Sequence, residues 1–169
     1  TMARRSSPMT LSARALSPEP GGIPSEIMQD ALGPFNDRLR QSALDTDWGQ
    51  VQVGADMEVR VNGRAFHLLS ESEQWQASAH IAEAVAHLSG DRLMVLDRFD
   101  VLDDIGRGEA LGWLDVLATS DEIDTAIVLG TLRTLSKSLP ATIQTLWLEG
   151  GEPGEAPAVE RPAREAAPA

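Results

Sequence analysis

The sequence has few of the residue types on which several common kinds of site depend. It contains no cysteine, which excludes disulfides and thiol chemistry. Lys137 is the only lysine among 14 basic residues. It lies outside any G-x-x-x-x-G-K-[ST] pattern, so the chain lacks the phosphate-binding loop that this pattern forms. No apolar run approaches the roughly 18 residues that a membrane span requires.

Histidine and positive charge are also scarce. The three histidines, His67, His80 and His87, are too scattered to form a zinc site by themselves. His80 and His87 lie on an expected helix, where we expect them to be partly exposed rather than metal ligands. The formal net charge of −12 excludes nucleic-acid binding through bulk electrostatics. Any connection with DNA would therefore be indirect.

The two ends of the chain differ in composition from its middle. Residues 1–24 are rich in serine and proline and have no apolar core for a secretory signal. Residues 150–169 consist mostly of glutamate, proline, alanine and glycine. We expect both ends to be disordered and residues 25–149 to form the folded domain. With no membrane span or secretory signal, we expect a cytoplasmic protein.

The first half of the domain predicts helix followed by short strands. A helix begins near Ser25, is interrupted at Gly33-Pro34, and resumes from Phe35 to Ala43. Alternating residues then predict strands over 50–54, 56–61 and 64–68, and Asn62-Gly63 is a strong hairpin sequence. This region is expected to be a small β-meander.

The second half alternates between helices and apolar strands. The expected elements are a helix over 70–88, a strand over 92–97, a helix over 105–118, a strand over 125–129, a helical turn over 133–138 and a strand over 142–148. The run Arg92 to Asp97 is typical of a strand buried on both faces. The fold class is therefore α/β, with a mainly parallel sheet flanked by helices and preceded by the meander.

Two segments of this half can carry chemistry. Leu69-Ser70-Glu71-Ser72-Glu73-Gln74-Trp75 reads as a capping box, with Ser70 at the cap and Glu73 three residues later. Taken alone it predicts a helix start, although such a start also offers N–H and hydroxyl groups to phosphate. The apolar strand over 92–97 ends on Asp97, whose carboxylate suits Mg²⁺ or its bound water.

In this order, the two segments resemble the signature and Walker B motifs of ABC-type ATPase heads in the SMC, RecN and RecF-like group. The resemblance covers about residues 45–149, and the form of the signature looks like that of SMC-like ATPases of phages and prophages. It implies the C-terminal half of a P-loop NTPase fold of the ABC type.

The resemblance also implies roles for particular residues. Ser70 matches the serine that contacts the γ-phosphate of ATP held by an opposite head, and Glu71, Ser72 and Glu73 complete the signature turn. Asp97 matches the aspartate that supports Mg²⁺. Asp104, or Asp103 if the loop is one residue shorter, matches the D-loop aspartate at the dimer interface. The strand 126–130 with Thr131-Leu132 matches the switch region.

The sequence departs from the family pattern at three places. Arg98 stands where the family has the glutamate that orients water, and a guanidinium cannot act as a base. Asp100 is a candidate substitute, so Asp97, Arg98 and Asp100 are the positions expected to decide catalysis. Leu132 stands where the family has the switch histidine. The Walker A half is missing, so ATP and Mg²⁺ are expected only in a site completed by another segment or chain.

Three functions remain open from the sequence. The first is the C-terminal lobe of an SMC/RecN-like ATPase, hydrolysing ATP only with a Walker A-bearing partner, in DNA maintenance, repair or phage replication. The second is a catalytically inactive, ATPase-like interaction module. The third is a general α/β domain in which Ser70 only caps a helix. If a lobe is missing, exposed edges predict a homo- or hetero-oligomer.

Overall fold

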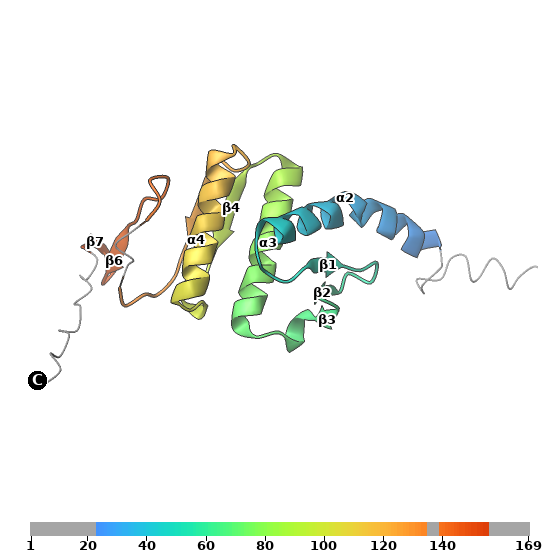
Figure 1. The fold of residues 1–169 in the computed structure, drawn as a ribbon, viewed down its shortest axis with the longest axis horizontal. Helices are drawn as coiled ribbons and strands as arrows, with labels where there is room; N and C mark the ends of the chain where they lie inside the picture. Colours follow the sequence, from blue (N-terminus) through green and yellow to red (C-terminus); the bar gives the residue numbers. More distant parts are fainter. Residues whose placement is uncertain (1–22, 135–138, 156–169) are drawn as a thin grey trace, which may run out of the picture.

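The computed structural model describes residues 23–134 and 139–155, and Figure 1 shows how their elements are arranged. A long helix, α2, and a small antiparallel sheet lie beside a second unit in which helices α3 and α4 pack on two parallel strands. The fold is thus α/β with a parallel strand pair. Among the described helices, none is long and apolar enough to cross a membrane.

Helix α2 (Ile23–Asp45) is continuous through Pro34, so the expected interruption at Gly33-Pro34 is wrong. Proline lacks an N–H donor and clashes with the carbonyl four residues earlier, which usually ends a helix. Here tertiary packing outweighs that preference. Leu39 is fully buried, and Leu32 and Phe35, on either side of the proline, pack against the same apolar cluster.

The β-meander is present, with each of its three strands shorter than expected. It consists of β1 (Val51–Val53), β2 (Val59–Val61) and β3 (Arg64–Ala65), paired antiparallel in the order β1-β2-β3. The Asn62-Gly63 turn joins β2 to β3, with φ of 49° and 80° at the two residues. A 3₁₀ turn, η1 (Phe66–Leu68), then leads to α3.

The larger core lies between α3 (Glu71–Ser89), α4 (Asp104–Thr119) and the parallel pair β4 (Leu93–Leu96) and β5 (Thr125–Val128). Met94 pairs with Ala126 and Leu96 with Val128 in the parallel register. Met94 and Leu96 are buried in a cluster with Trp48, Trp75 and Trp113. A short 3₁₀ turn, η2 (Phe99–Val101), follows β4 and directs the chain into α4.

The parallel pair is covered on one face only, contrary to the expectation that β4 is buried on both. Burial alternates along β4, where Leu93 is 50% and Val95 57% exposed. On the neighbouring strand Ile127 is 45% exposed, and Leu129 just beyond it is 49% exposed. Since parallel sheets are normally covered on both faces, this apolar face lacks a layer. We call these four residues the open sheet face.

The C-terminal part also differs from the expectation. The strand predicted over 142–148 does not join the parallel sheet. Instead β6 (Trp147–Glu149) pairs antiparallel with β7 (Glu152–Gly154) through a turn at Gly150-Gly151. This hairpin lies away from the α3–α4 unit (Figure 1). Strand β7 also falls within the tail that was expected to be disordered. It forms because two consecutive glycines with positive φ allow the chain to turn back and pair with β6.

Several expectations lie outside the described residues. They are residues 1–22 of the N-terminal segment expected to be disordered over 1–24, residues 135–138 of the expected helical turn, and the tail from residue 156. Residues 23 and 24 of that N-terminal segment belong to α2, which begins two residues before Ser25. His80, by contrast, is described and corrects a prediction: it is fully buried rather than partly exposed. His87 is a surface residue, with its side chain 40% exposed and Nδ1 3.0 Å from Glu122 Oε2.

Candidate functional site

The start of α3 and the end of β4 lie side by side. Because β4 runs back along the helix that precedes it, its carboxyl end returns to the helix amino end. The Trp75 indole Nε1 donates to the Asp97 carbonyl oxygen at 2.8 Å. Arg98 Nη2 donates to Glu71 Oε1 at 2.7 Å. The structure therefore brings the Ser70–Glu73 turn and the Asp97 strand end together, across 22 residues of sequence in the first contact.

The Ser70–Glu73 turn is a complete capping box. The Glu73 backbone N–H donates to Ser70 Oγ at 3.3 Å, and the Ser70 backbone N–H donates to Glu73 Oε2 at 2.8 Å. Ser70 Oγ also donates to Glu73 Oε2 at 2.9 Å, and Arg64 donates to the same carboxylate at 2.8 Å. These bonds, led by those from Ser70, lower the pKa of Glu73. The cap expected from the sequence is present, and Ser70 itself is exposed.

Asp97 is accessible at the end of β4, but it does not form a metal site with the other described residues. It is exposed at the strand end, and its Oδ1 accepts the Arg98 backbone N–H at 2.7 Å. No cluster of three or more histidine, cysteine or acidic side chains that could hold a metal ion occurs in the described ranges. Mg²⁺ needs about six oxygen ligands, several of which come from water and phosphate when protein donors are few. This chain's described side chains do not fit a complete Mg²⁺ site.

Arg98 is held in an unusual conformation. Its φ and ψ are 58° and 37°, in the left-handed region that residues other than glycine seldom adopt. The guanidinium lies across the start of α3, where its hydrogen bond to Glu71 raises the pKa of Arg98. The residue that directly follows Asp97 is therefore a permanent cation that is paired with the first turn of α3.

Asp100 joins the ends of the two parallel strands. Its Oδ1 accepts the Thr131 backbone N–H at 3.2 Å, just beyond β5. Gly130 packs closely against the same turn, since an added Cβ would lie 2.9 Å from the Phe99 Cβ. Leu132 is half-buried and packs against the main core. Asp100 thus fixes the segment that carries Leu132, and one of its oxygens is already in use.

The two D-loop candidates, Asp103 and Asp104, differ in the contacts of their carboxylates. Asp103 caps α4, and its Oδ1 accepts the Gly106 N–H at 2.7 Å. The Asp104 side chain is fully exposed and makes a 3.2 Å ion pair with Arg107. Both residues are exposed, but one oxygen of the Asp103 carboxylate is already used to cap its own helix.

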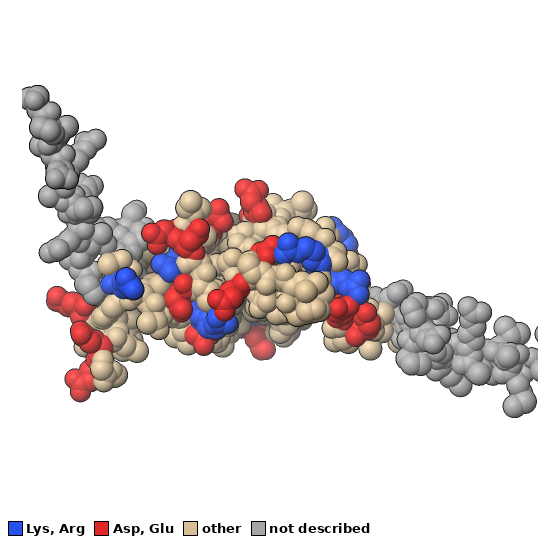
Figure 2. Space-filling model, turned by 90° about the horizontal axis from the view of Figure 1, so that it is seen from below, with Lys and Arg blue, Asp and Glu red and all other residues tan. Residues whose placement is uncertain are grey.

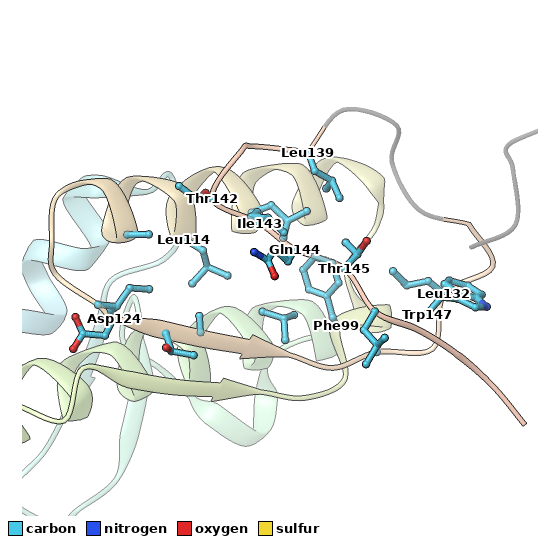
Figure 3. A pocket seen from close by; sticks show the side chains of 18 residues that line it. Phe99, Leu114, Asp124, Leu132, Leu139, Thr142, Ile143, Gln144, Thr145 and Trp147 are labelled. Atoms are coloured by element: carbon cyan, nitrogen blue, oxygen red, sulfur yellow. The ribbon is translucent and has the colours of Figure 1, made fainter. Parts of the chain in front are cut away.

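A groove flanks the site on the outer side of β5 (Figure 3). It has a volume of about 520 Å³ and lies between α4, β5 and the segment over 139–147. Leu111 and Leu114 of α4, Ala126 and Val128 of β5, and Ile143 and Trp147 line it. We call it the β5 groove. Its apolar lining comes from three separate segments of the chain, so no local sequence pattern predicts it.

Trp75 is the other residue whose role the sequence did not reveal. Its spacing predicts an apolar helix face, and it is indeed buried, but its indole N–H also holds the strand end. Around the site, charges of both signs are present. In the face shown in Figure 2, acidic side chains occur along the described body, with separate basic ones between them.

No family model matches the sequence, and comparison with curated proteins and with solved structures gives no match.

Proposed function

We propose that this chain is the C-terminal lobe of an SMC/RecN-like ATPase and supplies the signature turn, the Walker B aspartate and the D-loop to a composite ATP site. A Walker A-bearing lobe or chain would complete the site and bring ATP and Mg²⁺. The proposed setting is cytoplasmic DNA maintenance, repair or phage replication, within a homo- or hetero-oligomer. The acidic chain would meet DNA only through its partners.

The observation that carries the proposal is the meeting of two motifs at one end of the molecule. The turn at Ser70 and the strand end at Asp97 are joined by the 2.8 Å bond from Trp75. Both residues are exposed, so a second molecule can reach them. The capping bonds order the turn before any ligand arrives, and this lowers the entropy cost of binding.

The open sheet face and the β5 groove are apolar surfaces, which supports the proposal that a further lobe packs on this chain. Two parallel strands are too few for an independent sheet, and one face of these strands is apolar and exposed. A missing lobe that covers this face would supply the layer that parallel sheets ordinarily have.

The second candidate is an inactive interaction module, and Arg98 favours it. Arg98 replaces the water-orienting carboxylate and makes an ion pair with Glu71. Two acidic residues in the first turn of α3 also oppose an incoming phosphate. In this function the same apolar surfaces would bind a protein partner without nucleotide.

Calorimetric titration of ATP–Mg²⁺ separates the two candidates. The chain is titrated alone and then mixed with a Walker A-bearing chain encoded nearby. We expect binding only in the mixture, with at least tenfold weaker binding for Ser70→Ala and Asp97→Asn. Ser78→Ala on the same helix and Asp91→Asn before β4 are matched controls.

Equal partner association with and without nucleotide would favour the interaction module. Tight ATP binding by the chain alone would refute the composite site.

A further inference from the structure

The backbone around Arg98 is fixed by hydrogen bonds. Asp97 Oδ1 accepts the Arg98 N–H at 2.7 Å, and the Arg98 carbonyl accepts the Val101 N–H at 3.1 Å. The next residue, Phe99, donates its N–H to the Leu129 carbonyl at 2.9 Å. These bonds hold Arg98 in its left-handed conformation, so its long side chain starts from a fixed point at the end of β4.

The two acidic side chains in the first turn of α3 are bound by arginines in different ways. Arg64 Nη2 donates to both oxygens of Glu73, at 2.9 and 2.8 Å, and Glu73 also belongs to the capping box. Arg98 Nη2 donates to Glu71 Oε1 at 2.7 Å, and these two side chains are 62% and 71% exposed. Glu71 takes no part in the cap, so its bond to Arg98 can break without loss of the helix start.

The Arg98 guanidinium therefore lies between the two parts of the candidate site. It contacts the first turn of α3, and the carboxylates of Asp97 and Asp100 are close enough to attract its charge. A guanidinium binds phosphate through the same planar set of N–H groups with which it binds a carboxylate. Because an exposed ion pair contributes little free energy, a phosphate that reaches Arg98 can displace Glu71.

We propose that Arg98 binds a phosphate group of the nucleotide in the completed site, and that Glu71 occupies the Arg98 guanidinium in the free chain. This inference rests on the proposed function, since the partner brings the nucleotide. Glu71 then acts as an internal competitor, and nucleotide binding exchanges one ion pair for another. The competition lowers the apparent affinity for nucleotide, because only the fraction of molecules with a released guanidinium can bind it.

A double-mutant cycle tests this competition. ATP–Mg²⁺ is titrated by calorimetry into the full chain mixed with the Walker A-bearing chain encoded nearby. Glu71→Gln should tighten ATP binding by about two- to fivefold, the range that one exposed ion pair allows. Arg98→Gln should weaken ATP binding by about tenfold, since a charged hydrogen bond is lost. The gain from Glu71→Gln should disappear when Arg98→Gln is also present, because no guanidinium is left to release.

The exposed ion pair between Arg60 and Glu58 supplies matched controls. Both residues lie in the meander, and Glu58→Gln and Arg60→Gln change the net charge as the test variants do. They should leave the affinity for ATP unchanged. Raising the salt concentration from about 0.05 to 0.5 M should reduce the gain from Glu71→Gln, because salt screens exposed pairs. Circular dichroism confirms that each variant is folded.

The outcomes separate this inference from the proposed function. An equal gain from Glu71→Gln with and without Arg98 would overturn the competition, since Glu71 would then act only as a nearby charge. Unchanged or weaker ATP binding by Glu71→Gln would also overturn it. In both cases ATP binding in the mixture leaves the proposed function standing. No ATP binding in any mixture would refute the proposed function itself, and this inference with it.

Discussion

Lowering the pH should destabilise this protein through His80 before its carboxylates are protonated. The imidazole is fully buried between Trp48 and Trp113, with ring centroids 5.1 and 5.5 Å away. Its Nε2 lies 3.1 Å from Thr46 Oγ1. Its Nδ1 has no hydrogen-bond partner among the described residues. Burial lowers the pKa of His80 from 6.5 to about 4, because a charged ring here would be desolvated with one N–H unpaired.

The magnitude follows from linkage. In the unfolded chain the histidine takes up a proton near pH 6.5, whereas in the folded protein it does so only near pH 4. Between these values the unfolded state binds more protons, so stability falls as the pH is lowered. A shift of this size corresponds to about 3 kcal/mol across the window. The His80 contribution is fully present above pH 6.5 and is lost by pH 4.

Urea unfolding at several pH values from 7 to 5 measures this, since carboxylates titrate mostly below that range. Wild type should lose up to about 1.4 kcal/mol per pH unit below pH 6.5. His80→Phe keeps an aromatic ring in the cluster and should remove most of this slope. His87→Gln, on the exposed side of the same helix, is the control and should retain it. An unchanged slope in His80→Phe would refute the assignment.

Three further predictions concern stability. Ser70→Ala should cost about 1 kcal/mol through loss of the helix cap, measured by thermal unfolding; no change would mean the capping box is not formed in solution. Gly130→Ala should destabilise by about 1–3 kcal/mol, because the new Cβ would lie 2.9 Å from a neighbouring side-chain carbon. Gly112→Ala, in α4 with nothing within 4 Å, should instead stabilise by about 0.5–1 kcal/mol, and equal effects would contradict the packing argument. Arg38→Met should cost about 3 kcal/mol in urea unfolding, since it leaves the buried carboxylate of Glu83 without its cation; the double variant with Glu83→Leu should recover much of that loss.

Local sequence patterns predicted the elements whose causes are local. Asn62-Gly63 accepts the positive φ of its turn, and Ser70 with Glu73 forms a cap that needs only four residues. The alternation of helices and apolar runs predicted α3, β4, α4 and β5, because each pattern records which side of an element faces a core. The same sequence order allowed Ser70 and Asp97 to be predicted as one candidate site.

Contacts between distant residues decided the rest. Pro34 remains inside α2 because Leu32, Phe35 and Leu39 pack on the meander, a contact that no local pattern records. The apolar runs at β4 and β5 predicted burial on both faces, yet which faces are covered depends on what other elements are present. Sequence by itself determined the cap at Ser70, the turn at Asn62-Gly63 and the absence of a phosphate-binding lysine, because these depend on residue chemistry and short-range geometry. Only the tertiary structure placed Trp75 on Asp97, exposed one face of β4 and β5 and left a groove along β5, because these depend on which segments pack together.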